Sequence, residues 1–123
     1  PSDDFVAAQH EALMAHVEDL RGQVGPTIRI ADEAEKRRVR EGLVASYLPT
    51  WAENAEKQLG DGPFVAGDKL HVVDIKLYLT VRWFIGGKVD YIPATIFAAY
   101  PKLNRVYEAV RDHAGVTSWY ARG

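Results

Sequence analysis

Residues 64–85 have the sequence FVAGDKLHVVDIKLYLTVRWFI, in which a short turn leads into a long apolar segment. The second part of this stretch, Val72–Ile85, is apolar almost all round and contains neither glycine nor proline. A helix that is apolar on every side is typical of the centre of a bundle. Val, Ile, Tyr and Trp are also common in strands, but the length of the unbroken segment favours a helix. We therefore predict a buried central helix over Val72–Ile85, with the aromatic residues of the segment in the core.

The residues just before this segment have the pattern of a helix N-terminus. His71 stands at the N-cap and Asp74 at the third helical position, from which a carboxylate can accept a hydrogen bond from the N–H of residue 71. Leu70 and Ile75 occupy the two positions of a hydrophobic staple. Because His is a weaker cap than Ser or Thr, we expect half a capping box, formed by Asp74.

Helical patterns also precede the central segment. From Asp3 to Gly22 apolar positions, continued by Val24, recur at three- and four-residue steps, as on one face of an amphipathic helix that Gly22, Gly25 and Pro26 end or kink. A second pattern extends over residues 32–59 and begins at Asp32, a favoured N-cap residue. Pro49 lies inside this second helix. A proline removes one helical hydrogen bond, so we expect a bend there.

Shorter helical segments follow the central one. We predict a short helix over residues 94–99, a longer one that begins at Tyr100-Pro101 and ends at Gly115, and a last one over residues 116–121. No pair of strands with hairpin residues is visible. The predicted fold class is therefore all-α, a single helical bundle over residues 1–123.

Composition argues against several functions. The formal net charge of −2 argues against a nucleic-acid partner and against docking on an anionic membrane. No apolar run approaches the roughly 20 residues of a membrane helix. The absence of cysteine excludes disulfides and thiolate nucleophiles and fits a cytoplasmic protein. The four histidines include no pair at helical i,i+4 spacing, so we predict no metal site.

The turn and helix start at residues 64–75 resemble the C-terminal domain of cytosolic glutathione transferases. In that family an F-x-x-G-D turn leads into the central helix through a capping box, usually with Ser or Thr where this chain has His71. The segments Tyr100-Pro101-Lys102-Leu103 and Leu48-Pro49-Thr50-Trp51 are similar to features of the sigma- and pi-like members. The resemblance covers nearly the whole chain.

This resemblance implies a role for the segment Val17-Glu18-Asp19-Leu20-Arg21. In sigma- and pi-like members an acidic residue at this position reaches across a homodimer. It meets the ammonium of the γ-glutamyl group of glutathione, the co-substrate, on the other subunit. Asp19 matches that residue, and Glu18 stands beside it. The end of the same helix forms one wall of the pocket for the electrophile. By position, the candidates for that wall are Arg21, Val24, Gly25 and Arg29.

The family activates the thiol of glutathione with a Tyr, Ser or Cys from an N-terminal thioredoxin-like domain, which is not in this sequence. The first residue is Pro1 rather than Met, so we expect a fragment or a processed product. The sequence holds no catalytic residue on this interpretation. We therefore expect the isolated chain to be inactive, although the parent protein would be a transferase.

Two other interpretations stay open. Domains of this type also serve as non-catalytic interaction modules in elongation-factor subunits and in tRNA-synthetase-associated proteins. An interaction module has no need of an acid at the glutathione position, so Asp19 favours the transferase. An unrelated helical bundle is the third interpretation, and the turn, the capping Asp and the Tyr-Pro-x-Leu segment together argue against it.

Overall fold

A computed structural model of the chain describes residues 4–60, 62–65, 67, 69–87 and 89–113, with side chains from residue 7 onward. These residues form five α-helices: α1 (Asp4–Val24), α2 (Glu33–Gly42), α3 (Leu48–Gln58), α4 (Val72–Ile85) and α5 (Pro101–Asp112). A 3₁₀ helix, η1 (Gly25–Arg29), follows α1, and a π-helical turn, η2 (Leu43–Tyr47), joins α2 to α3. No β-strand occurs within these ranges, which confirms the predicted all-α class.

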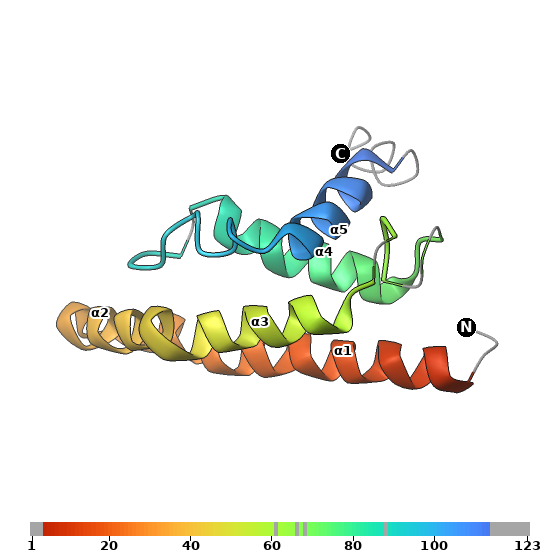
Figure 1. Cartoon of the computed structure of the whole chain (residues 1–123). Coiled ribbons are helices and arrows are strands. Elements are labelled where there is room, and N and C mark those ends of the chain that lie inside the picture. The colour runs from red at the N-terminus through yellow and green to blue at the C-terminus, as the bar shows by residue number, and fades with distance from the viewer. Residues whose placement is uncertain (1–3, 61, 66, 68, 88, 114–123) are drawn as a thin grey trace, which may run out of the picture.

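The helices form two layers. Figure 1 shows α1 with α2 and α3 in one layer and α4 with α5 in the other. The core lies between the layers. It is built from buried apolar residues of α1, α3, α4 and α5, among them Leu13, Val17, Leu20, Trp51, Leu77, Val81, Phe84, Leu103 and Val106.

Helix α4 has the predicted bounds and a central place, since it packs on both α1 and α5. Its inner side is buried, as predicted for a central helix, but its outer side is not. Its side chains Val72, Ile75, Leu79 and Ile85 are between 36 % and 62 % exposed. The helix therefore has apolar side chains on both its buried and its exposed sides.

The N-terminus of α4 depends on Asp74, whose side chain is fully buried. Its Oδ2 accepts from the N–H of His71 (2.8 Å), and its Oδ1 accepts from the N–H of Val65 (2.7 Å). The Nδ1 of His71 lies 3.1 Å from the carbonyl oxygen of Lys69. The hydrogen bond predicted from the N–H of His71 to Asp74 is therefore present.

The turn before α4 needs a glycine at one position. Phe64 and Gly67 pair through two backbone hydrogen bonds of 2.9 and 3.2 Å, and Gly67 has a φ of +104°. That conformation is open to glycine and strained for other residues. Leu70 of the predicted staple packs at the edge of the core, whereas Ile75 lies at the surface.

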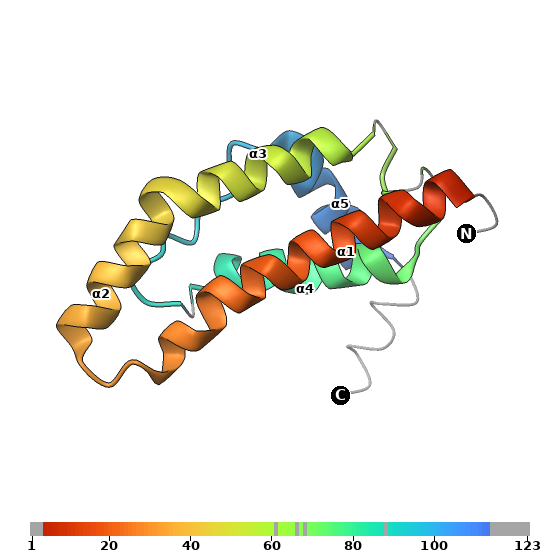
Figure 2. The same cartoon turned by 90° about the horizontal axis from the view of Figure 1, so that it is seen from below.

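Helices α2 and α3 form one bent rod (Figure 2). The N–H of Leu48 donates to the carbonyl oxygen of Leu43, five residues back, which is the bond of a π-turn. Pro49, which has no N–H to donate, follows directly. The bend predicted at the proline is therefore present, and the π-turn before it was not predicted.

The predicted short helix over residues 94–99 is wrong. This segment makes successive turns, in which the N–H groups of Ile96, Ala98 and Tyr100 each donate to a carbonyl three residues back. Helix α5 then begins at Pro101, as predicted, but ends at Asp112 rather than at Gly115, because His113 has an extended backbone. The helix predicted over residues 116–121 lies outside the described residues.

Candidate functional site

A cleft of about 480 Å³ lies where the end of α1 and η1 face the second half of α4. One side is lined by Arg21, Gly25 and Ile28, and the other by Leu79, Thr80 and Trp83. Ile28 and Leu79 expose large parts of their side chains to solvent, 59 % and 47 % respectively. The cleft is therefore open and has mostly apolar sides, with one charged side chain, Arg21, among its described lining residues.

Arg40 of α2 holds the η1 side of this cleft in place. Its guanidinium is buried, and its Nε donates to the hydroxyl of Thr27 (2.9 Å) while its Nη1 donates to the carbonyl of Asp90 (3.2 Å). The hydroxyl of Thr27 in turn donates to the carbonyl of Val24. No carboxylate of the described residues forms an ion pair with Arg40. The cation is instead satisfied by oxygens that fix η1, and with it Ile28, against α4.

The four residues predicted for the pocket wall have different positions. Arg21 and Gly25 line the cleft. Val24 does not, because its side chain is fully buried in the core with Leu20. Arg29 is exposed at the end of η1 and is not among the lining residues. The structure therefore brings together two of the four and corrects the position expected for Val24.

Three lining residues of the cleft come from α4 and were missed. Of the aromatic residues predicted to lie in the core, Tyr78 and Phe84 are buried. Trp83 is only half-buried and lines the cleft with Leu79, four residues earlier. The spacing of Ile75, Leu79 and Trp83 is that of one helix face. That spacing was the available signal, but the apolar residues on the other faces obscured it.

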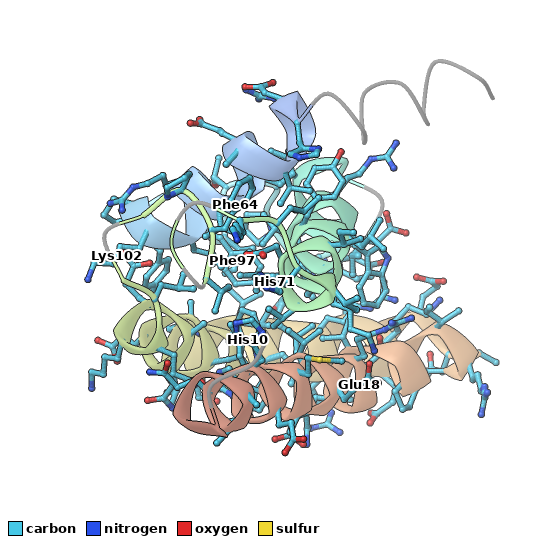
Figure 3. All side chains as sticks on the ribbon, turned by 90° about the vertical axis from the view of Figure 1, so that its right-hand side faces the viewer. His10, Glu18, Phe64, His71, Phe97 and Lys102 are labelled. Atoms are coloured by element: carbon cyan, nitrogen blue, oxygen red, sulfur yellow. The ribbon has the colours of Figure 1, made fainter. Side chains whose placement is uncertain are left out.

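Glu18 and Asp19 project toward different sides of α1. The Oε1 of Glu18, which Figure 3 labels on α1, lies 3.4 Å from the Nζ of Lys76 on α4 and 3.9 Å from Arg21. Asp19 is exposed and makes no hydrogen bond or ion pair with the described residues. Burial raises the pKa of Tyr47 in η2, and the charge of Asp19 raises it further. Glu18 thus belongs to the side of the cleft, and Asp19 to the side of η2.

A second hollow of about 410 Å³ adjoins the cleft. It is lined by Leu79, Arg82, Trp83, Ile85 and Gly86 of α4 and by Tyr107 of α5. Leu79 and Trp83 line both hollows, so they form a ridge between them. The two hollows lie along the exposed side of α4.

A pair of histidines lies at the opposite end of α4. His10 of α1 is buried and points toward His71, with 5.0 Å between the ring centroids (Figure 3). Its Nε2 has no hydrogen-bond partner among the described residues. Burial and, secondarily, the nearby His71 lower the pKa of His10, against a smaller opposing effect of Asp74. The imidazole of His10 is therefore harder to protonate in the folded chain than in the unfolded one.

We expect this histidine to make stability depend on pH. A lowered folded-state pKa means that the unfolded chain binds the proton more readily, so the contribution is complete above the unfolded pKa of about 6.5 and is lost as pH falls below it. Urea unfolding should show that the free energy of unfolding falls more between pH 7.5 and pH 5.5 in the wild type than in His10→Gln. Equal losses in the two proteins would contradict this assignment.

No group of three or more metal-binding side chains occurs among the described residues, and none of the described helices is long and apolar enough to cross a membrane.

The sequence model of one family, described as glutathione S-transferase, C-terminal domain, matches residues 18–123. The chain belongs to this family. No curated protein and no solved structure matches the chain significantly. The matched part of this glutathione S-transferase C-terminal domain includes Glu18, Asp19, both sides of the cleft and the capped start of α4.

Proposed function

We propose that the chain is the C-terminal half of a catalytic glutathione transferase of the sigma- or pi-like group. In this proposal glutathione is bound mainly by an N-terminal thioredoxin-like domain, and the cleft between η1 and α4 forms one wall of the electrophile pocket. The membership of the family and the open apolar sides of the cleft support it. The parent protein acts as a cytoplasmic homodimer.

The exposed carboxylate of Asp19 is the main support for the catalytic proposal. Its carboxylate is exposed and has no hydrogen-bond or ion-pair partner among the described residues, whereas its neighbour Glu18 is close to two cations. A carboxylate without an internal partner is available to an ammonium outside the domain, such as that of glutathione. Because Asp19 is on the η2 side and the cleft is on the other, it would serve glutathione bound to a second subunit.

The exposed apolar side of α4 favours a second candidate, a non-catalytic interaction module. Val72, Ile75 and Leu79 lie on one side of α4 and are partly exposed, and exposed apolar side chains grouped in this way are typical of a surface that a protein partner covers. In the catalytic proposal the thioredoxin-like domain covers part of this surface. The two candidates differ in whether glutathione is bound and used.

Asp19→Asn tests the catalytic proposal in the full-length protein that contains this chain. We expect the KM for glutathione to rise about tenfold, which corresponds to about 1.4 kcal/mol, with kcat toward chlorodinitrobenzene little changed. The same assay with a glutathione analogue that lacks the α-amino group of the γ-glutamyl residue completes a thermodynamic cycle. The wild type should bind the analogue less well than it binds glutathione. Asp19→Asn should bind the analogue and glutathione equally well.

Glu11→Gln is the matched control, because Glu11 is also an exposed acid of α1 and its replacement removes the same charge. Its KM for glutathione should not change. A full-length protein without measurable glutathione conjugation would favour the interaction module. An active enzyme in which Asp19→Asn leaves the KM unchanged would refute the role of Asp19.

A further inference from the structure

Positive charges outnumber negative ones at the Arg21 edge of the cleft. Arg21 lines it, and no carboxylate does among the described lining residues. The carboxylate of Glu18 lies 3.9 Å from Arg21 and 3.4 Å from Lys76, so a single negative charge is shared between two positive ones. The edge of the cleft therefore keeps a net positive charge.

The contact between Arg21 and Glu18 leaves Arg21 available to a ligand. It is long for an ion pair, and both side chains are more than half exposed, at 62 % and 54 %. Exposed pairs of this kind contribute little to stability, so the guanidinium can turn toward another anion at small cost. A planar guanidinium also binds a carboxylate or sulfonate through two parallel hydrogen bonds.

The rest of the cleft suits an aromatic ring. Trp83 offers an aromatic surface and Leu79 and Ile28 offer aliphatic ones, all of them partly exposed. The hydroxyl of Thr80, the other polar group, donates to the carbonyl of Lys76 (3.0 Å), so its proton is already used within α4. The cleft has a volume of about 480 Å³ and is open to solvent.

We propose that the cleft between η1 and α4 selects flat apolar compounds that carry one anionic group, with the rings against Trp83 and Leu79 and the anion at Arg21. This proposal rests on the proposed function and narrows it, because it names the class of electrophile that the cleft takes. Neutral aromatic compounds of the same shape bind more weakly, since they leave Arg21 without a new partner.

Two probes of the same shape test the proposal: 2-naphthoate, which carries a carboxylate, and 2-naphthamide, which is neutral. Titration calorimetry on the full-length protein should give about fivefold tighter binding of 2-naphthoate, and the preference should shrink as salt is raised. Arg21→Gln should abolish the preference and leave the affinity for 2-naphthamide unchanged. Trp83→Ala should weaken both probes by similar factors.

Arg38→Gln is the matched control, since Arg38 is an exposed, ion-paired arginine of α2 that does not line the cleft. It should leave the affinities for both probes unchanged. Equal affinities in the wild type, a preference that survives in Arg21→Gln, or an equal loss in Arg38→Gln would each overturn the proposal. An enzyme that conjugates chlorodinitrobenzene but shows no preference for 2-naphthoate would refute this inference and leave the proposed function standing.

Discussion

Replacing Asp74 with alanine should lower the free energy of unfolding by about 3 kcal/mol, because the two backbone N–H groups that its carboxylate accepts from would be left without a partner. These groups belong to His71 and Val65, so one side chain fixes both the first turn of α4 and the loop before it. The carboxylate is fully buried, so water does not replace it readily. Urea unfolding followed by circular dichroism measures the loss.

Two further variants separate the cap from a general effect of charge. Asp74→Asn keeps one acceptor oxygen and should lose about half as much stability. Glu53→Ala removes an exposed acid of α3 and should stay within about 0.5 kcal/mol of the wild type. A loss of less than 1 kcal/mol in Asp74→Ala would mean that the two hydrogen bonds do not hold the start of α4.

Trp51→Ala should be the most destabilising single change, by about 4 kcal/mol, as is typical when a large buried aromatic side chain is truncated. Trp51 is 1 % exposed and joins three parts of the chain. Its Nε1 donates to the carbonyl of His16 on α1 (2.7 Å), its ring stacks on the ring of His16, and it contacts Phe97 in the segment before α5. The variant loses packing between both layers of the fold.

Trp51→Phe distinguishes packing from the hydrogen bond. It keeps most of the aromatic surface and leaves the His16 carbonyl without its indole donor, so we expect a loss between that of Trp51→Ala and the wild type. Chemical unfolding of both variants under the same conditions gives the comparison. If the two variants were equally stable, the aromatic ring would not be the main contribution of Trp51.

The bounds of α4 and the role of Asp74 could be predicted because both depend on residues close in sequence. The cap of α5 could not. The carboxylate of Glu56 on α3 accepts from the N–H groups of Lys102 (2.7 Å) and Leu103 (2.9 Å), and nothing in the sequence relates residues so far apart. Arg40 is a similar case, since its partners Thr27 and Asp90 lie on segments that only the packed fold brings together.

The candidate site was predictable to the extent that one helix determines it. Arg21 and Gly25 follow from the position of the family's pocket wall on α1, and the structure places both on the cleft. Val24 belongs to the same apolar stripe as Val17 and Leu20, so the periodicity itself indicated a core position. The α4 side of the cleft was missed because a helix with apolar residues on all faces gives no sign of which face stays open.

The π-turn at Leu43–Tyr47 has a consequence for how the length of this chain can vary. A π-turn is equivalent to one residue inserted into an α-helix, and one residue corresponds to about 100° of rotation. Deleting a residue here would restore regular winding and rotate α3 against α2. The chain could then keep the hydrogen bond from Arg40 to Thr27 or the contact of Trp51 with α1, but it could not keep both. Length changes among relatives should therefore occur in the loop between α3 and α4 rather than in this rod.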